Sequence, residues 1–224
     1  MNIKSASQRS FSLSSFKLVS RFNIFLFAIV CAIAYGSGQA TAETAAGKTA
    51  GNDSTPLQKV QATIDEIVEI VQQNSGDDSK DVRRQKLREV INPVFDFDEM
   101  AKRSLGPHWN KVTPEEQAEF VSVFSDLLAK TYLGKIETVK PGMVKVTKEK
   151  VDAPRAEVKT SVTNKGDTFP IDYKLQNTSG SWRVYDVEIE NIGLVANYRN
   201  EFAGIIRKES FASLIERLKK KKEE

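Results

Sequence analysis

The spacing of apolar residues divides the chain into a helical first part, an alternating middle and a helical end. Between residues 56 and 74 the apolar residues recur at helical intervals, which predicts a first helix. A second helix is predicted over residues 80–91. A short third one ends at Gly106, with Asp96 or Asp98 as its N-cap.

The clearest helix start in the sequence lies at Thr113. This residue is suited to the N-cap position, Pro114 to the first helical position, and Glu116 completes a capping box. One wide apolar face is predicted for this helix, formed by Phe120, Val123, Phe124, Leu127, Leu128 and Tyr132.

The apolar period changes from about 3.6 to 2 at Gly142. Apolar residues alternate with polar ones in four stretches, within residues 144–146, 156–162, 169–175 and 185–189, and turn-forming residues separate these stretches. This pattern predicts a four-stranded antiparallel meander with one apolar face. A long helix is predicted from Asn191, followed by a shorter one. The fold class is therefore α+β, a curved antiparallel sheet covered by N- and C-terminal helices, with room for an apolar pocket between the layers.

The first 42 residues have the features of a secretory signal peptide. Four basic residues and no acidic one come before the apolar stretch Phe22–Ala34, and Ala40-Thr41-Ala42 suits a cleavage site. Residues 43–55 are small and polar, which predicts a disordered linker. A single domain is expected over 56–218, with helices over about 56–140, the sheet over about 143–190 and helices over 191–218. A charged tail, 219–224, follows.

Removal of the signal peptide changes the charge of the chain. The whole sequence has 33 basic and 30 acidic residues, and the signal peptide contains four basic ones, so 29 basic residues remain against 30 acidic. This balance does not favour nucleic acid as a partner. The only cysteine, Cys31, is also lost. A disulfide and thiol chemistry are therefore not expected in the mature chain.

The residues offer little for catalysis. His108 is the only histidine and is predicted to lie in a loop, so neither a metal site nor a His-based catalytic group is expected. An isomerase of cone-like fold would need a carboxylate whose pKa is raised by burial, and Asp96, Asp98 and Asp172 are the available candidates. For Asp96 and Asp98 the role of helix cap is the simpler interpretation.

The aromatic residues leave two interpretations open. They fall on the predicted sheet and on the predicted helix faces, where they would line a cavity or fill a core. Periodicity does not distinguish these two cases, because both need the same apolar face.

Two segments of the chain resemble the toluene-tolerance, or MlaC, family. They are "FDFDEMAKRSLGPHWNKVTPEEQAEFVSVFSDLLAKTYLGKI", residues 95–136, and "WRVYDVEIENIGLVANYRNEFAGIIRKESFASLIERL", residues 182–218. The resemblance implies a cone-like sheet of the nuclear-transport-factor type and an apolar pocket for the acyl chains of a glycerophospholipid. It also implies no catalysis and no cofactor.

The resemblance further implies a place in the cell and a set of partners. The protein is expected in the periplasm, as a monomer that shuttles lipid to maintain outer-membrane lipid asymmetry. Its partners would be an inner-membrane ABC transporter with an MCE-type substrate-binding ring and an outer-membrane lipoprotein–porin complex.

Strand alternation and helix faces then predict which residues line the pocket. The set comprises Val144, Val146, Phe169, Ile171, Tyr173, Leu175, Val187, Ile189, Leu194, Tyr198 and Phe202, with Leu133, Ile136, Phe97 and Leu105 as further candidates. Arg199 lies at the edge of the apolar face of its helix, where it would either contact the head group or pair with a nearby acid. Three alternatives to a phospholipid carrier remain: a carrier of another lipid such as a hopanoid, a small-molecule isomerase, and a scaffold without a pocket.

Overall fold

The structure is a computed structural model that describes residues 54–223. The predicted signal peptide, residues 1–42, and most of the predicted linker lie outside the described residues. The helices are α2 (Pro56–Gln73), α3 (Lys80–Ile91), α4 (Phe97–Leu105), α5 (Pro114–Ile136), α6 (Leu194–Lys208) and α7 (Phe211–Glu223), with two short 3-10 helices, η2 (Asp77–Ser79) and η3 (Gly106–Lys111). The strands are β1 (Val144–Asp152), β2 (Arg155–Asn164), β3 (Asp167–Thr178), β4 (Ser181–Ile189) and β5 (Ile192–Gly193).

Two helices begin with a complete capping box. The predicted box at the start of α5 is confirmed: Thr113 Oγ accepts from the Glu116 N–H at 3.2 Å, and Glu116 accepts from the Thr113 N–H at 2.8 Å. The same reciprocal arrangement joins Thr55 and Gln58 at the start of α2. Thr55, the last residue of the predicted linker, therefore belongs to the fold. Of the two candidate caps for α4, Asp96 fills the role, because its carboxylate accepts from the Glu99 N–H at 3.1 Å.

The strands form one curved antiparallel sheet in the order β1-β2-β3-β4-β5. The predicted four-stranded meander is present, and β5 adds a short fifth strand at the β4 edge. Bulges interrupt the register between Val146 and Lys148 and between Lys174 and Leu175. Bulges increase local bending of a strand, in keeping with a strongly curved sheet.

The predicted start of the last long helix is wrong by three residues. Asn191 has a positive φ of 64° and belongs to a turn, and Ile192 pairs with Ile189 as part of β5. Helix α6 starts only at Leu194, where the Asp186 carboxylate of β4 accepts from the Val195 N–H at 3.0 Å. The apolar pattern alone did not reveal this contact, because Asp186 lies in the preceding strand, nine residues before Val195.

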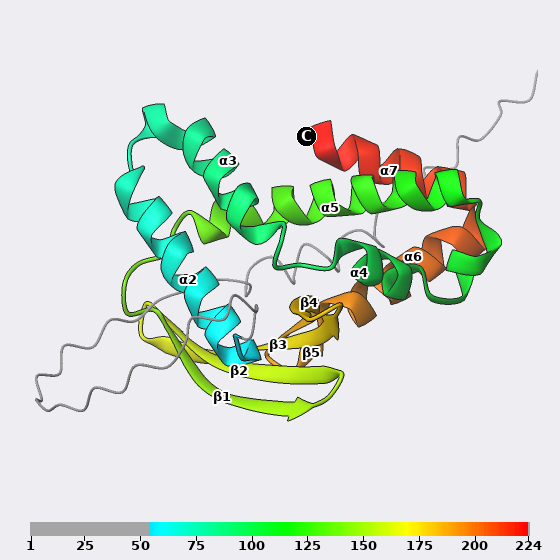
Figure 1. The fold of residues 1–224 in the computed structure, drawn as a ribbon. Helices are drawn as coiled ribbons and strands as arrows, with labels where there is room; N and C mark the ends of the chain where they lie inside the picture. The colour runs from blue at the N-terminus through cyan, green and yellow to red at the C-terminus, as the bar shows by residue number, and fades with distance from the viewer. Residues whose placement is uncertain (1–53, 224) are drawn as a thin grey trace, which may run out of the picture.

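The helices cover one face of the sheet (Figure 1). Helix α2 packs against β1 and β2, while α6 packs against β4 and also against α4. Helix α5 runs across the upper layer beside α7, and α3 lies near its C-terminal half. Within residues 54–223, no helix combines the length and the apolar character that a membrane span requires.

Candidate binding cavity

A cavity of about 170 Å³ lies where α3, α4 and α5 meet the sheet. Its lining is Arg88, Ile91, Asn92, Phe95, Phe97, Met100, Ser125, Asp126, Leu128, Ala129, Tyr132, Leu133, Ile136, Tyr173, Val187, Ile189 and Leu194. Most of these side chains are aliphatic or aromatic, so the site suits an apolar ligand.

The C-terminal half of α5 forms one wall of the cavity. Leu128, Tyr132 and Ile136 are spaced four residues apart, as are Ala129 and Leu133, so they form two adjacent rows on one helix face. Burial raises the pKa of the Tyr132 phenol to about 12, so its hydroxyl group stays protonated well above neutral pH.

The sheet forms the opposite wall through β3 and β4. Tyr173 pairs with Val187 across the two strands, and Ile189 follows two residues later on the same face. Burial also raises the pKa of the Tyr173 phenol far above its ordinary value. The lining residues of this wall, Tyr173, Val187 and Ile189, are all uncharged at neutral pH.

A short extended segment before α4 completes the lining. The Asp96 N–H donates to Val184 O, and the Val184 N–H donates to Val94 O, both at 2.8 Å. These two bonds tie the segment to β4 in a parallel bridge. They place Phe95 beside Phe97, with their ring centroids 5.9 Å apart in a stacked arrangement.

A second hollow of about 60 Å³ adjoins the first beneath α2. The two linings share Ile91, Phe95, Ile136 and Tyr173, so the two hollows are direct neighbours. Helix α2 contributes mainly aliphatic residues to the second hollow. Rotation of a few shared side chains would therefore extend the cavity deeper between the helices and the sheet.

The polar lining residues are confined to two helices. Arg88 on α3 and Asn92, the C-cap of α3, are exposed, while Ser125 and Asp126 are half-buried and lie on α5. All four belong to the solvent-facing part of the lining, which marks this side as the mouth of the cavity. The arrangement suits a ligand with an apolar body and a polar end.

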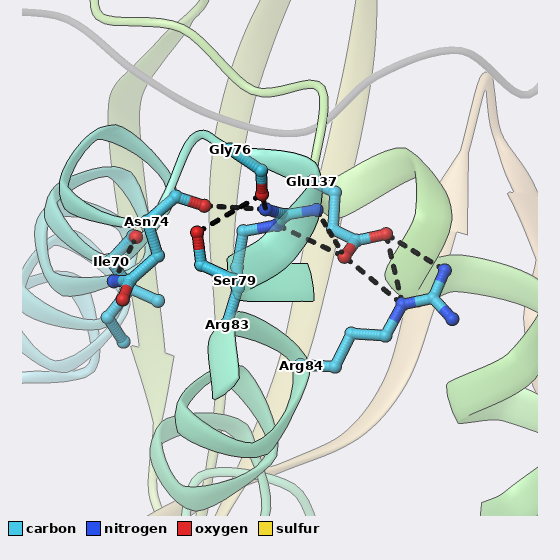
Figure 2. Close-up of polar contacts among 7 residues, drawn as sticks. All are labelled: Ile70, Asn74, Gly76, Ser79, Arg83, Arg84 and Glu137. Atoms are coloured by element: carbon cyan, nitrogen blue, oxygen red, sulfur yellow. Dashed lines mark hydrogen bonds and ion pairs between the residues drawn. The ribbon is translucent and has the colours of Figure 1, made fainter. Parts of the chain in front are cut away.

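An ion-pair clamp holds α3 in place over this mouth (Figure 2). Glu137, just after α5, accepts from Arg83 at 3.1 Å and from Arg84 at 2.9 Å. Arg83 also donates to the backbone oxygens of Asn74 and Gly76 in the turn after α2. One guanidinium thus joins the turn after α2, helix α3 and the end of α5.

The clamp shifts the pKa of its carboxylate. Burial alone would raise the pKa of Glu137, whose side chain is only 9% exposed. Hydrogen bonds and charges from Arg84 and Arg83 together outweigh burial, and the pKa of Glu137 falls below its ordinary value. Glu137 is therefore ionised at neutral pH.

The predicted lining residues fall into three groups. Those that line the cavity are Phe97, Leu133, Ile136, Tyr173, Val187, Ile189 and Leu194. Those in the sheet core are Val144, Ile171 and Leu175, with Val146 and Phe169 packed at its edge. Those in the core between the helices are Leu105, Tyr198 and Phe202. Contact between these residues and a lipid stays a prediction.

The predicted lining residues outside this cavity lie on the expected faces but pack in the sheet core or between the helices. Helix α2 covers β1 and β2, so Val144 is buried in the same apolar cluster as Val60 and Ile64. Tyr198 and Phe202 pack with Phe124 in an aromatic cluster between α5 and α6.

Arg199 also lies away from the cavity. Its Nε donates to the backbone oxygen of Arg103 at 2.7 Å, at the end of α4. Its aliphatic stem lies against Gly106, where a Cβ atom would approach Arg199 Cδ to 3.3 Å. The positive φ of Gly106, 54°, also favours glycine there. Arg199 therefore fixes the packing of α6 on α4.

Sequence reasoning missed the residues of α3 and several of α5. The α5 part of the lining was predictable in part, because Leu128 and Tyr132 belong to the predicted apolar face of this helix. The sequence pattern did not indicate Arg88 and Asn92 as lining residues, because α3 is mostly polar and buries only Arg83 and Leu87.

The three carboxylates considered for an isomerase lie outside the cavity lining. Asp96 caps α4 and accepts from Gln176 at 3.3 Å, and Asp98 is exposed. Asp172 pairs with Lys159 at 2.6 Å. This placement does not favour the isomerase alternative.

Carboxylates also converge on the side of the sheet where Lys159 lies. Oxygens of Glu157, Asp172 and Glu188 lie within 4.8 Å of one another, close enough to share a cation. Lys159 already pairs with Glu157 and Asp172, and Lys174 pairs with Glu188. The two ammonium groups pair with all three carboxylates and offset two of their three negative charges, which fits a role in cross-strand pairing.

The fold and the cavity define a class of α+β binding protein, in which a curved sheet and a helical layer enclose an apolar site. The MlaC protein family model matches residues 61–220. The chain therefore belongs to the MlaC family, as its resemblance in sequence indicated.

Relatives and a solved structure agree with this assignment. Toluene tolerance protein ttg2D of Pseudomonas putida is 27% identical over 159 residues, covering 69% of this chain and 74% of its own. The intermembrane phospholipid transport system binding protein MlaC of Haemophilus influenzae is 20% identical over 179 residues, covering 76% and 84%. The solved structure of a phospholipid-binding protein from Ralstonia solanacearum, in complex with a phospholipid, has a TM-score of 0.67 at 24% identity. It covers 75% of this chain and 97% of that one, and shows that the two share a fold.

Proposed function

We propose that this protein binds a glycerophospholipid in the α3–α5–sheet cavity and carries it between membranes. The observation that carries the proposal is the distribution of charge in the lining: Arg88 on α3 and Asp126 on α5 are its charged residues, and the remaining lining residues are uncharged. Membership of the MlaC family and the names of the relatives support the same ligand class.

The physical need for such a carrier follows from the cost of exposing acyl chains to water. Each methylene removed from water contributes about 0.8 kcal/mol, so a two-chain lipid does not cross an aqueous space uncovered. Enclosed between α5 and the sheet, the chains would meet side chains such as Leu133, Tyr173 and Val187 instead of water.

The cavity must widen to accept such a ligand. Its volume of about 170 Å³ is close to the roughly 150 Å³ of an engineered cavity that holds one benzene molecule. Because Glu137 holds α3 through Arg83 and Arg84, the widening would come from the side chains that line the cavity and not from this helix. The adjoining hollow beneath α2 offers further space once Tyr173 and Ile136 turn aside. A docked partner that favours the widened state would also promote release.

The cellular role proposed is shuttling in the periplasm that maintains outer-membrane lipid asymmetry. The lipid would pass between an outer-membrane lipoprotein–porin complex and an inner-membrane ABC transporter with an MCE-type ring. The predicted signal peptide supports export, and no catalytic step or cofactor is proposed. A rigid ligand such as a hopanoid remains the alternative cargo.

The test is to identify the lipid that the mature protein retains. The protein is expressed from the full chain, purified after export, denatured and extracted with organic solvent, and the lipids are identified by mass spectrometry. Near one phospholipid per chain is the expected result. Protein that is consistently empty, and that takes no lipid from vesicles, would contradict the proposal.

A further inference from the structure

Two polar side chains at the C-terminal end of α3, Arg88 in its last turn and Asn92 at its C-cap, lie at the cavity mouth. Arg88 and Asn92 are four residues apart, which places them on the same helix face, and both belong to the lining. Arg88 is the only basic residue in that lining.

The guanidinium of Arg88 differs from most arginines of the described chain in having no partner. The arginines that donate to a carboxylate or a backbone carbonyl are Arg83, Arg84, Arg103, Arg183, Arg199 and Arg217. Between residues 54 and 223, no hydrogen bond or ion pair involves the side chain of Arg88 or that of Asn92.

Neighbouring contacts hold this pair at the mouth. Arg83 and Arg84 of the same helix are engaged by Glu137, so α3 is fixed one to two turns before Arg88. The helix ends directly after this turn, where the Asn92 N–H donates to Arg88 O at 2.9 Å. The two free side chains therefore stand on an anchored helix.

We propose that Arg88 and Asn92 form the head-group site of this carrier and bind the phosphate of the lipid. This inference rests on the proposed function and adds the residues that recognise the polar end. A guanidinium offers a planar pair of N–H donors that matches phosphate oxygens, and the carboxamide of Asn92 adds further donors. The phosphate stays at the solvent-facing mouth while the acyl chains enter the apolar part.

A carboxylate at the same mouth narrows the class of head group. Asp126 on α5 is the one acidic residue of the lining. Asp126 already interacts within the described chain, but its negative charge near the mouth still disfavours a head group with a net negative charge. A zwitterionic head group, in which an amine accompanies the phosphate, is therefore more suitable. Phosphatidylethanolamine is therefore the appropriate probe.

The test compares loading of two lipids that differ only in the head group. Protein emptied of lipid is incubated with vesicles that contain phosphatidylethanolamine and diacylglycerol of identical acyl chains, and the ratio bound is measured by mass spectrometry. The wild type is expected to prefer the phospholipid. Arg88→Gln should lower that preference about tenfold, Arg88→Lys should lose part of it, and Asn92→Ala should reduce it less than Arg88→Gln.

The matched control is Arg155→Gln. Arg155 is exposed on β2, outside the cavity lining, and its side chain has no partner within the described residues. This variant should keep the wild-type lipid ratio, and thermal melting should show that Arg88→Gln remains folded, because no contact is lost.

The outcomes separate the head-group site from the carrier itself. The wild type could load phospholipid while Arg88→Gln shows the same ratio of bound phosphatidylethanolamine to diacylglycerol. That result would contradict the head-group site but not the carrier function. Wild type that loads neither lipid overturns both. Soluble sn-glycerol 3-phosphate at millimolar concentration should leave loading unchanged. If it competes in the wild type but not in Arg88→Gln, the site is one for free phosphate esters, and the head-group inference is wrong.

Discussion

The two halves of α5 show the same apolar periodicity and opposite packing. In the N-terminal half, Phe120 and Phe124 are fully buried and stack with ring centroids 5.6 Å apart. Phe202 meets both of them edge-on. In the C-terminal half, residues such as Ala129 and Tyr132 line the cavity.

The difference lies in the helices that face each half. The N-terminal half is covered by α6 and α7, which carry broad apolar faces that include Phe202 and Leu214. The C-terminal half faces α3, which offers Leu87 as its only buried apolar side chain. A helix face thus becomes a filled core or a cavity wall according to its partner, and its own sequence does not decide which.

The largest loss of stability is expected in the filled half. Phe202→Ala should reduce the free energy of unfolding by about 3–5 kcal/mol, because it removes a fully buried ring from the aromatic cluster. Urea unfolding measures this loss. The folded fraction should retain as much phospholipid per chain as the wild type, and a selective loss of lipid would show instead that Phe202 lines the binding site.

A smaller loss is expected from the clamp between α3 and α5. Glu137→Gln should cost roughly 2–4 kcal/mol, because it leaves the buried guanidinium of Arg83 without its counter-charge. Glu89→Gln on the exposed side of α3 is the matched control and should have little effect. Equal stability of the two variants would contradict a clamp role for Glu137.

The effect of Glu137→Gln should depend on pH. The pKa of Glu137 is lowered in the folded protein, so its stabilising contribution is present above the ordinary glutamate pKa, near 4.5. It is lost as the pH falls through the lowered value. The difference in unfolding free energy between wild type and variant should therefore be constant near neutrality and shrink at acidic pH. A constant difference down to pH 3 would assign the loss to packing alone.

A change within the cavity half should affect lipid far more than stability. Ala129→Trp places a large ring in the cavity, with an expected change in unfolding free energy within about 1–2 kcal/mol. Phospholipid recovered per chain should fall severalfold, as measured by mass spectrometry. Ala118→Trp, on an exposed part of α5, is the matched control. A normal lipid content in Ala129→Trp would place the ligand elsewhere.

The smallest effect is expected at the glycine in the cavity half of α5. A Cβ atom at Gly134 would meet nothing within 4 Å, so Gly134→Ala should stabilise the helix by about 0.5–1 kcal/mol. The melting temperature should rise by about 1–4 °C. Lipid content should stay the same, and a decrease would show that α5 must bend at Gly134 during loading.

The sequence predicted local structure well where the signal is local. The capping box at Thr113 and the alternation of the strands led to the correct elements and fold class. The start of α6 was misplaced, because its cap, Asp186, comes from another element. Local patterns do not contain such contacts.

The site was only partly predictable for the same reason. Tyr173 and Val187 were predicted to line a pocket because strand alternation gives their direction, and the structure places them at the cavity. The same rule also selected Ile171 and Leu175, which meet a filled core in the structure. Arg88 was not predicted, since only the tertiary position of α3 brings it to the cavity.

The most direct measurement of the central claim is photocrosslinking with a phospholipid that carries a diazirine on its acyl chain. The labelled lipid is loaded into the mature protein and the complex is irradiated. The modified residues are then mapped by peptide mass spectrometry. Binding in the cavity predicts crosslinks in the C-terminal half of α5, residues 128–136, and on β3 and β4 around Tyr173 and Val187. Crosslinks concentrated in the aromatic cluster, around Phe120 and Phe202, would contradict it.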